Sequence, residues 1–135
     1  MKCPACRETM AIIEYRSIEL DYCVKCMGVW FDQSEIDLLL KTAATFTDGM
    51  IPVFKKLTTQ INEDVRPCPL CKKTMHKVSL GGSKTVLDQC PDGEGIWFDA
   101  GELAASIAAV AGANQEPVLT LLREFLGAAI NVPEK

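Results

Sequence analysis

The stretch Cys23-Val24-Lys25-Cys26-Met27-Gly28-Val29-Trp30-Phe31-Asp32-Gln33-Ser34-Glu35 decides how this chain folds. It joins a pair of cysteines to a Gly-x-Trp-Phe-Asp run, and the run leads into residues typical of a helix N-terminus. The same pattern returns as Cys90-Pro91-Asp92-Gly93-Glu94-Gly95-Ile96-Trp97-Phe98-Asp99-Ala100-Gly101-Glu102, with Gly93 in place of the second cysteine. The chain therefore holds an internal duplication, in which each copy is one supersecondary unit.

A second cysteine pair precedes the stretch and predicts a metal site. Sixteen residues separate the pair Cys3 and Cys6 from the pair Cys23 and Cys26, which is a spacing typical of zinc sites. Two cysteines three positions apart on a tight turn can direct both sulfurs at one metal, while the intervening residues run out and back as a hairpin. Four thiol ligands fill a tetrahedral Zn²⁺ site, so we expect a structural zinc ion here and not a catalytic one.

The second copy keeps three of the four cysteines: Cys68, Cys71 and Cys90. His76 is the only histidine of the chain and lies in this copy, five residues after a cysteine pair. Imidazole suits a thiolate-rich zinc site better than carboxylate does, so His76 is our preferred fourth ligand for a second zinc ion. Glu94 or Asp92 is an alternative ligand, and so is an empty or water-completed position. His76 could also be an ordinary exposed residue on a basic strand.

Local patterns predict hairpins and helices around these cysteines. Residues 11–15 and 17–22 are rich in β-branched and aromatic side chains and suit two short antiparallel strands. Asp32 and Glu35 have the spacing of a capping box, which predicts a helix that ends near Thr47. The second copy repeats this cap and leads into a helix at 103–111, and further helices are expected at 52–61 and after Pro117.

The predicted fold is therefore a small α+β metal-bound protein with two zinc-ribbon β-hairpin modules, joined by helices and followed by a C-terminal helix. The expected boundaries are 1–47 for the first module with its helix and 48–67 for a helical linker. Residues 68–112 form the divergent second module, and 113–135 form the C-terminal helix and tail.

Composition limits the class of protein. The 135 residues carry a net charge of −4, which counts against a general binder of phosphate backbones. The first cysteine follows the initial Met too closely for a signal peptide, and no apolar run approaches the length of a membrane span. We expect a cytoplasmic protein, where clustered cysteines bind metal more often than they form disulfides. The seven cysteines are also an odd number, which would leave one unpaired in a disulfide framework.

Both modules resemble the TFIIB-type zinc-ribbon family of small bacterial proteins, whose pattern is Cys-Pro-x-Cys, a hairpin, Cys-x-x-Cys-x-Gly-x-Trp-Phe-Asp and a Glu-Leu helix start. The first copy has Glu35-Ile36 at the helix start, and the second has Glu102-Leu103 but departs at Gly93. The resemblance implies that all seven cysteines are zinc ligands. It covers about two-thirds of the chain and carries no activity with it.

Three functions fit these observations. The first is a non-enzymatic adaptor that binds a protein partner. The second is a transcription-related module that binds nucleic acid through Lys72, Lys73, Lys77 and Lys84. In that function the Trp-Phe pairs at 30–31 and 97–98 would stack on bases, although an aromatic next to a metal site is more often core. The third is a thiol oxidoreductase, since Cys-Pro-x-Cys also occurs in thioredoxin-like sites. Catalytic zinc is disfavoured, because three anionic thiolates would blunt the acidity of the metal.

Overall fold

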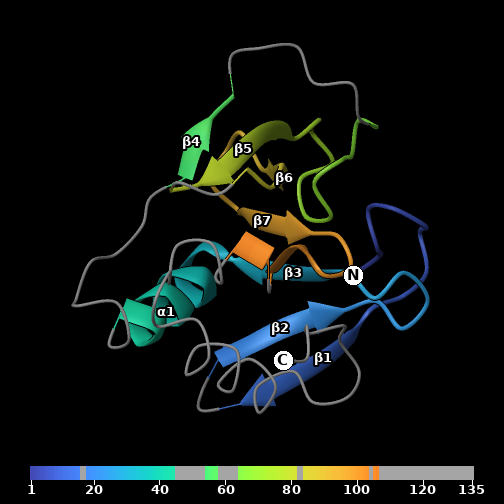
Figure 1. Ribbon diagram of the computed structural model, residues 1–135. Helices are drawn as coiled ribbons and strands as arrows, with labels where there is room; N and C mark the ends of the chain where they lie inside the picture. Colours follow the sequence, from blue (N-terminus) through green and yellow to red (C-terminus); the bar gives the residue numbers. More distant parts are fainter. Residues whose placement is uncertain (16–17, 45–53, 58–63, 82–83, 104, 107–135) are drawn as a thin grey trace.

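The computed structural model describes residues 1–15, 18–44, 54–57, 64–81, 84–103 and 105–106. Within them the chain forms the helix α1 and seven strands that make one antiparallel sheet in the order β1-β2-β3-β7-β6-β5-β4 (Figure 1). Residues 102–103 and 105–106 are also helical. The first three strands are β1 (Ala11–Tyr15), β2 (Ile18–Tyr22) and β3 (Val29–Asp32). The others are β4 (Phe54–Lys56), β5 (His76–Leu80), β6 (Leu87–Gln89) and β7 (Gly95–Phe98). The predicted hairpin strands of the first module are thus confirmed.

The two copies meet edge to edge through β3 and β7, which lie side by side in the middle of the sheet (Figure 1). In their antiparallel register Trp30 is opposite Trp97, and Val29 is opposite Phe98. The equivalent tryptophans therefore face each other, and the pair Val29–Phe98 is matched by the pair Phe31–Ile96, which gives the joint an approximate twofold symmetry. We expected helices to join the modules; in the described residues, backbone pairing between the two Gly-x-Trp-Phe-Asp strands joins them instead.

The apolar sequence of β3 and β7 suits this central position. Val29, Trp30 and Phe31 are buried, as are all four residues of β7. A short run that is apolar at every position is typical of a strand covered on both faces. Phe31 and Phe98 meet on one face, with ring centroids 5.8 Å apart and planes at 86°, an edge-to-face contact that favours the pairing of the copies.

Helix α1 (Gln33–Ala44) begins where the capping box predicts. The Asp32 backbone N–H donates to Glu35 Oε1 at 3.0 Å, and in the second copy the Asp99 N–H donates to Glu102 Oε1 at 2.8 Å. Each glutamate therefore satisfies a backbone donor at the start of its helix, as predicted. Ile36 is fully buried, and α1 packs against β2, β3 and β7.

The predicted helix at 52–61 is not found at residues 54–56, which form strand β4 along β5. Phe54 is opposite Leu80 and is half-buried there, while Lys55 and Lys56 are exposed. Without β4 the edge of β5 would present unpaired backbone groups, so pairing outweighs the weak helical pattern. The predicted C-terminal helix, the end of α1 near Thr47 and most of the helix at 103–111 lie outside the described residues.

Candidate metal centres

The four cysteines of the first module form one cluster. Their sulfurs all lie within 4.8 Å of one another, and the Sγ atoms of Cys6 and Cys23 are 3.5 Å apart. Two of these cysteines come from the turn before β1, and the other two from the turn between β2 and β3. Cys3 and Cys23 are buried, whereas Cys6 and Cys26 are partly exposed. The hairpin therefore brings the two pairs together as the spacing predicts.

Backbone donors point at the sulfurs of this cluster. The N–H groups of Ala5 and Cys6 donate to Cys3 Sγ at 3.3 and 3.4 Å. In the second turn the Cys26 N–H donates to Cys23 Sγ at 3.2 Å. Such bonds stabilise the thiolate form, which is the form that binds metal.

Four thiols this close cannot all ionise by themselves. Burial raises the pKa of Cys3 and of Cys26. In contrast, a hydrogen bond from the Glu8 backbone N–H lowers the pKa of Cys6 to about 7. A divalent cation removes this conflict, because a coordinating thiol is deprotonated outright. The donor set therefore fits tetrahedral Zn²⁺ with every position supplied by the protein, a closed structural site.

The second cluster holds three thiols. The sulfurs of Cys68, Cys71 and Cys90 lie within 4.8 Å of one another, and those of Cys71 and Cys90 are 3.5 Å apart. The Leu70 and Asp92 N–H groups donate to Cys68 Sγ and Cys90 Sγ, each at 3.4 Å. Burial raises the pKa of Cys68 to about 11. These residues fit zinc in the same way as the first cluster, but with one protein ligand fewer.

The turn that lacks a cysteine has a different backbone. In the other three cysteine turns the residue four positions after the first cysteine has a positive φ: Arg7 at 69°, Met27 at 64° and Lys72 at 69°. Its N–H donates to the carbonyl of that cysteine at 2.7 to 2.9 Å. In the fourth turn Gly93 takes the positive φ, 76°, one position earlier, and donates to the Cys90 carbonyl at 3.1 Å. The substitution therefore changes the turn as well as removing a ligand, which sequence reasoning missed.

His76 is not brought to the thiols. It lies on β5, and its Nε2 is 3.1 Å from Gln89 Oε1 on β6. Asp92 Oδ2 pairs with Lys73 Nζ at 2.6 Å, and Glu94 is exposed. In the described parts of the chain the second metal-binding group consists of its three cysteines alone, so the structure shows no fourth ligand.

Trp30 and Trp97 are fully buried in the joint between the copies. Both rings belong to one core cluster with Met10, Met75 and the buried cysteines of both sites. Each indole N–H donates to the aspartate of its own motif, Trp30 to Asp32 at 3.3 Å and Trp97 to Asp99 at 2.8 Å. Neither ring is available for base stacking, so these residues support the metal sites and the helix caps.

The two motif glycines are functional residues of this joint that sequence reasoning did not assign. A Cβ on Gly28 would lie 2.7 Å from Trp97 Cη2 and closer still to Cζ2 of the same ring, and a Cβ on Gly95 would lie 2.7 Å from Trp30 Cζ2. Each glycine thus lets the tryptophan of the other copy pack directly on its backbone. The repeated Gly-x-Trp spacing was the available signal, but it does not say which tryptophan covers which glycine.

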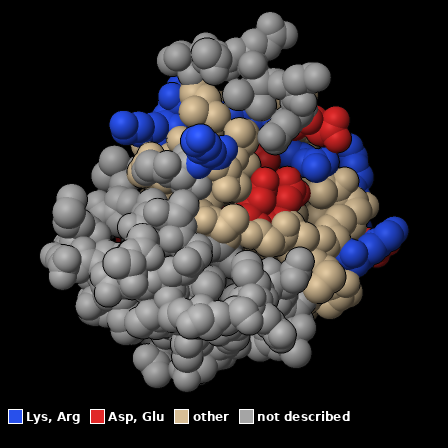
Figure 2. Space-filling model, in the orientation of Figure 1, with Lys and Arg blue, Asp and Glu red and all other residues tan. Residues whose placement is uncertain are grey.

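The lysines proposed to bind nucleic acid are largely engaged with the protein itself. Lys77 Nζ lies 2.6 Å from Asp88 Oδ1 and 2.7 Å from the Asp64 carbonyl oxygen, and this side chain is only 14% exposed. Lys73 pairs with Asp92, as above, and Lys72 Nζ donates to the Pro69 carbonyl at 3.1 Å. Lys84 is exposed. On the face shown in Figure 2 acidic side chains lie between the basic ones.

A zinc ribbon is a three-stranded antiparallel unit whose paired cysteine turns close on a metal. This chain contains two such units in one sheet. The second copy is a variant with three cysteines. The family model described as transcription factor zinc-finger, a TFIIB-type zinc ribbon, matches residues 2–42 and 67–109, and the chain belongs to this family. Comparisons with curated proteins and with solved structures found no match. No helix in the described residues is long and apolar enough to cross a membrane.

Proposed function

We propose that this protein is a non-enzymatic cytoplasmic adaptor, in which two structural zinc sites hold a rigid scaffold for a protein partner. The observation that carries this proposal is the burial of both motif tryptophans in the joint between the copies, 0% exposed in each case. Single-strand binding uses exposed aromatic platforms, and here the aromatic rings of the motif form the core.

The remaining surface supports a protein partner over a polyanion. Lys73 and Lys77 are neutralised by Asp92 and Asp88, and the whole chain is acidic. Large apolar side chains stay exposed on the cysteine turns, Val24 at 68% and Leu70 at 44%. Apolar groups between charges of both signs are common at protein interfaces, whereas nucleic-acid interfaces are strongly positive.

The thiols give no support to an oxidoreductase. All seven cysteines lie in the two clusters, where their sulfurs face one another. Redox sites of the thioredoxin type place their low-pKa thiolate at a helix N-terminus. The low-pKa Cys6 and the other thiols sit on the turns of β-hairpins instead.

The proposal is tested by measuring nucleic-acid binding and partner capture on the zinc-loaded full chain. Fluorescence anisotropy with single-stranded and duplex oligonucleotides at low salt should show no binding, and photo-crosslinkers at Val24 and Leu70 should capture a protein in cells. A crosslinker at Lys55 on β4 serves as the control position.

The rival functions give opposite results. Salt-dependent oligonucleotide binding that is lost in a Lys72→Glu, Lys73→Glu double variant, but kept in a Lys55→Glu, Lys56→Glu control, would replace the adaptor with a nucleic-acid module. Turnover of a disulfide substrate by metal-free protein would replace it with a thiol oxidoreductase.

A further inference from the structure

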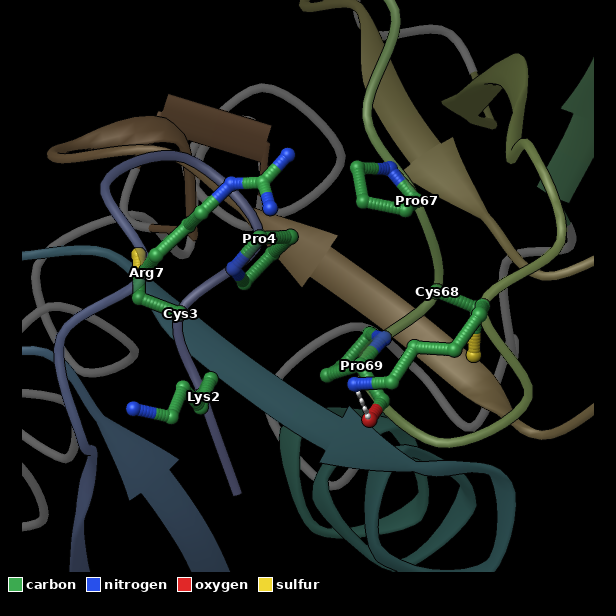
Figure 3. Close-up of a pocket in the computed structure, with 8 residues that line it drawn as sticks. Lys2, Cys3, Pro4, Arg7, Pro67, Cys68 and Pro69 are labelled. Carbon is green, nitrogen blue, oxygen red and sulfur yellow. Dashed lines mark hydrogen bonds between the residues drawn. The ribbon is translucent and has the colours of Figure 1, made fainter.

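The first cysteine turns of the two copies enclose a small hollow between them (Figure 3). Its volume is about 160 Å³, and both Cys3 and Cys68 belong to its lining. Besides these cysteines, three cationic side chains and three prolines line the hollow: Lys2, Arg7, Lys72, Pro4, Pro67 and Pro69. Equivalent residues of the two copies face one another here, so the hollow follows the approximate symmetry of the sheet.

Three cationic side chains gather at this hollow. Within the described chain, neither Lys2 nor Arg7 has an acidic side chain within 4.0 Å, whereas Lys25, Lys73 and Lys77 each have one. Lys72 Nζ donates to the Pro69 carbonyl of its own turn, which is neutral. All three cations are exposed side chains that border one hollow, so an anion placed there would lie among several positive charges.

The backbone adds a second reason to assign a role to two of these cations. Arg7 and Lys72 occupy the left-handed positions of their turns, each with φ 69°. Glycine and asparagine take this conformation more easily than long side chains do. The equivalent residue of the turn at Cys23 is Met27, which is also left-handed but does not line the hollow. Positive charge thus occurs at the left-handed position of the two turns that border the hollow.

We propose that this hollow binds a carboxylate side chain on an acidic segment of a partner protein; the inference rests on the adaptor function and gives it a docking point. The volume is well below the roughly 300–1,000 Å³ of small-molecule pockets, so the hollow receives one group and not a whole ligand. The cations pair with the carboxylate, and the proline walls contact the methylene groups that carry it. A phosphate backbone would leave these apolar walls without a partner.

The test uses the zinc-loaded full chain and a fluorescein-labelled peptide of alternating Glu and Ala, with a Gln-for-Glu peptide as the uncharged match. The binding variant combines Arg7→Asn with Lys72→Asn, because asparagine keeps the left-handed turns while removing both charges. Met27→Asn makes the same change at a left-handed position outside the hollow and serves as the matched control. Native mass spectrometry first confirms that each variant holds as much zinc as the wild type.

We expect the Glu peptide to bind the wild type in a salt-dependent way and the Gln peptide to bind at least about tenfold more weakly. The double variant should bind the Glu peptide about tenfold more weakly than the wild type does, because it lacks two partly screened ion pairs. Met27→Asn should bind the peptide like the wild type. Equal binding of both peptides, or an unchanged affinity in the double variant, overturns the proposal.

Two competitors separate this inference from other anions and from the proposed function. A labelled oligonucleotide that binds through the same two cations would overturn both the carboxylate site and the adaptor function. Displacement of the peptide by inorganic phosphate at the same low concentrations as glutamate peptide would assign a free-phosphate site instead. Failure of the peptide to bind, with crosslinked protein still captured at Val24 or Leu70, would reject the hollow and leave the adaptor function standing.

Discussion

The substitution Gly95→Ala tests the joint between the two zinc ribbons directly. A methyl group at this position would lie 2.7 Å from the Trp30 ring and 3.1 Å from Asp32 Cα, and closer still to the Phe31 carbonyl oxygen. Two of these three neighbours are backbone atoms of β3, which cannot rotate away as the end of a flexible side chain can. Strand β7 would therefore have to move away from β3, which disturbs the only pairing that joins the copies in the described sheet.

The magnitude follows from these contacts. Overpacking a well-packed core costs about 1–3 kcal/mol, and contact with backbone places this case at the upper end, about 3 kcal/mol. The nearby Gly93→Ala is the matched control, because a Cβ there meets nothing within 4 Å. Its only cost is the positive φ of 76°, for which the penalty is roughly 1–2 kcal/mol. The two alanine variants should therefore differ by about 1–2 kcal/mol.

The assay is equilibrium unfolding in urea, followed by tryptophan fluorescence, with the same free zinc concentration for every protein because bound metal adds to apparent stability. Both tryptophans lie in the joint, so the signal reports on it. Gly95→Ala should unfold at a lower urea concentration than Gly93→Ala, with a similar slope. If Gly95→Ala is as stable as the wild type, or no less stable than Gly93→Ala, the close packing of the copies inferred from the structure is wrong.

Three further predictions concern buried charge, pH and the second metal site. Lys77→Met leaves the Asp88 carboxylate, 3% exposed, without its cation and should lower the free energy of unfolding by about 3 kcal/mol in chemical denaturation. Burial raises the pKa of Glu35 to about 6, so the folded state favours its protonated form. The free energy of unfolding of the wild type should therefore fall, relative to that of Glu35→Gln, as the pH rises from about 4.5 through 6. The variant has no titrating side chain at position 35, and thermal unfolding of both proteins across this range measures the difference. His76→Ala should leave the zinc count in native mass spectrometry unchanged, because the ring bonds Gln89 and not the thiol cluster.

Each of these predictions has a result that contradicts it. A Lys77→Met protein as stable as the wild type would show that Asp88 is hydrated or otherwise paired. Parallel pH profiles for the wild type and Glu35→Gln would mean that the carboxyl is not desolvated in the folded state. Loss of one zinc ion in His76→Ala would restore His76 as the fourth ligand of the second site.

The cysteine clusters and the helix caps were predictable because their signals are local. The pair Cys3 and Cys6 meets the pair Cys23 and Cys26 across one hairpin, and the spacing alone specifies that hairpin. The capping glutamates lie three residues from the backbone groups that they bind. The family pattern follows from the same short motifs, which explains why it matches both copies.

The sequence left other features open because they depend on distant backbone. His76 has the right residue type for zinc, but the β5–β6 register places it opposite Gln89. The loss of a cysteine at Gly93 was visible, whereas the shift of the left-handed residue was not, since glycine permits many turns. A weak helical pattern at 54–56 yielded to the unpaired edge of β5.

The amino-acid sequence by itself determined that there are two ribbons, which thiols meet in each, and where α1 begins. Only the tertiary structure decided that β3 pairs with β7, that each glycine packs on the tryptophan of the other copy, and that a cationic hollow lies between Arg7 and Lys72. The physical reason is that backbone hydrogen bonds between strand edges are the same for every residue type. Which edges meet is fixed by the packing of side chains from both copies, and this becomes visible only when the whole sheet is assembled.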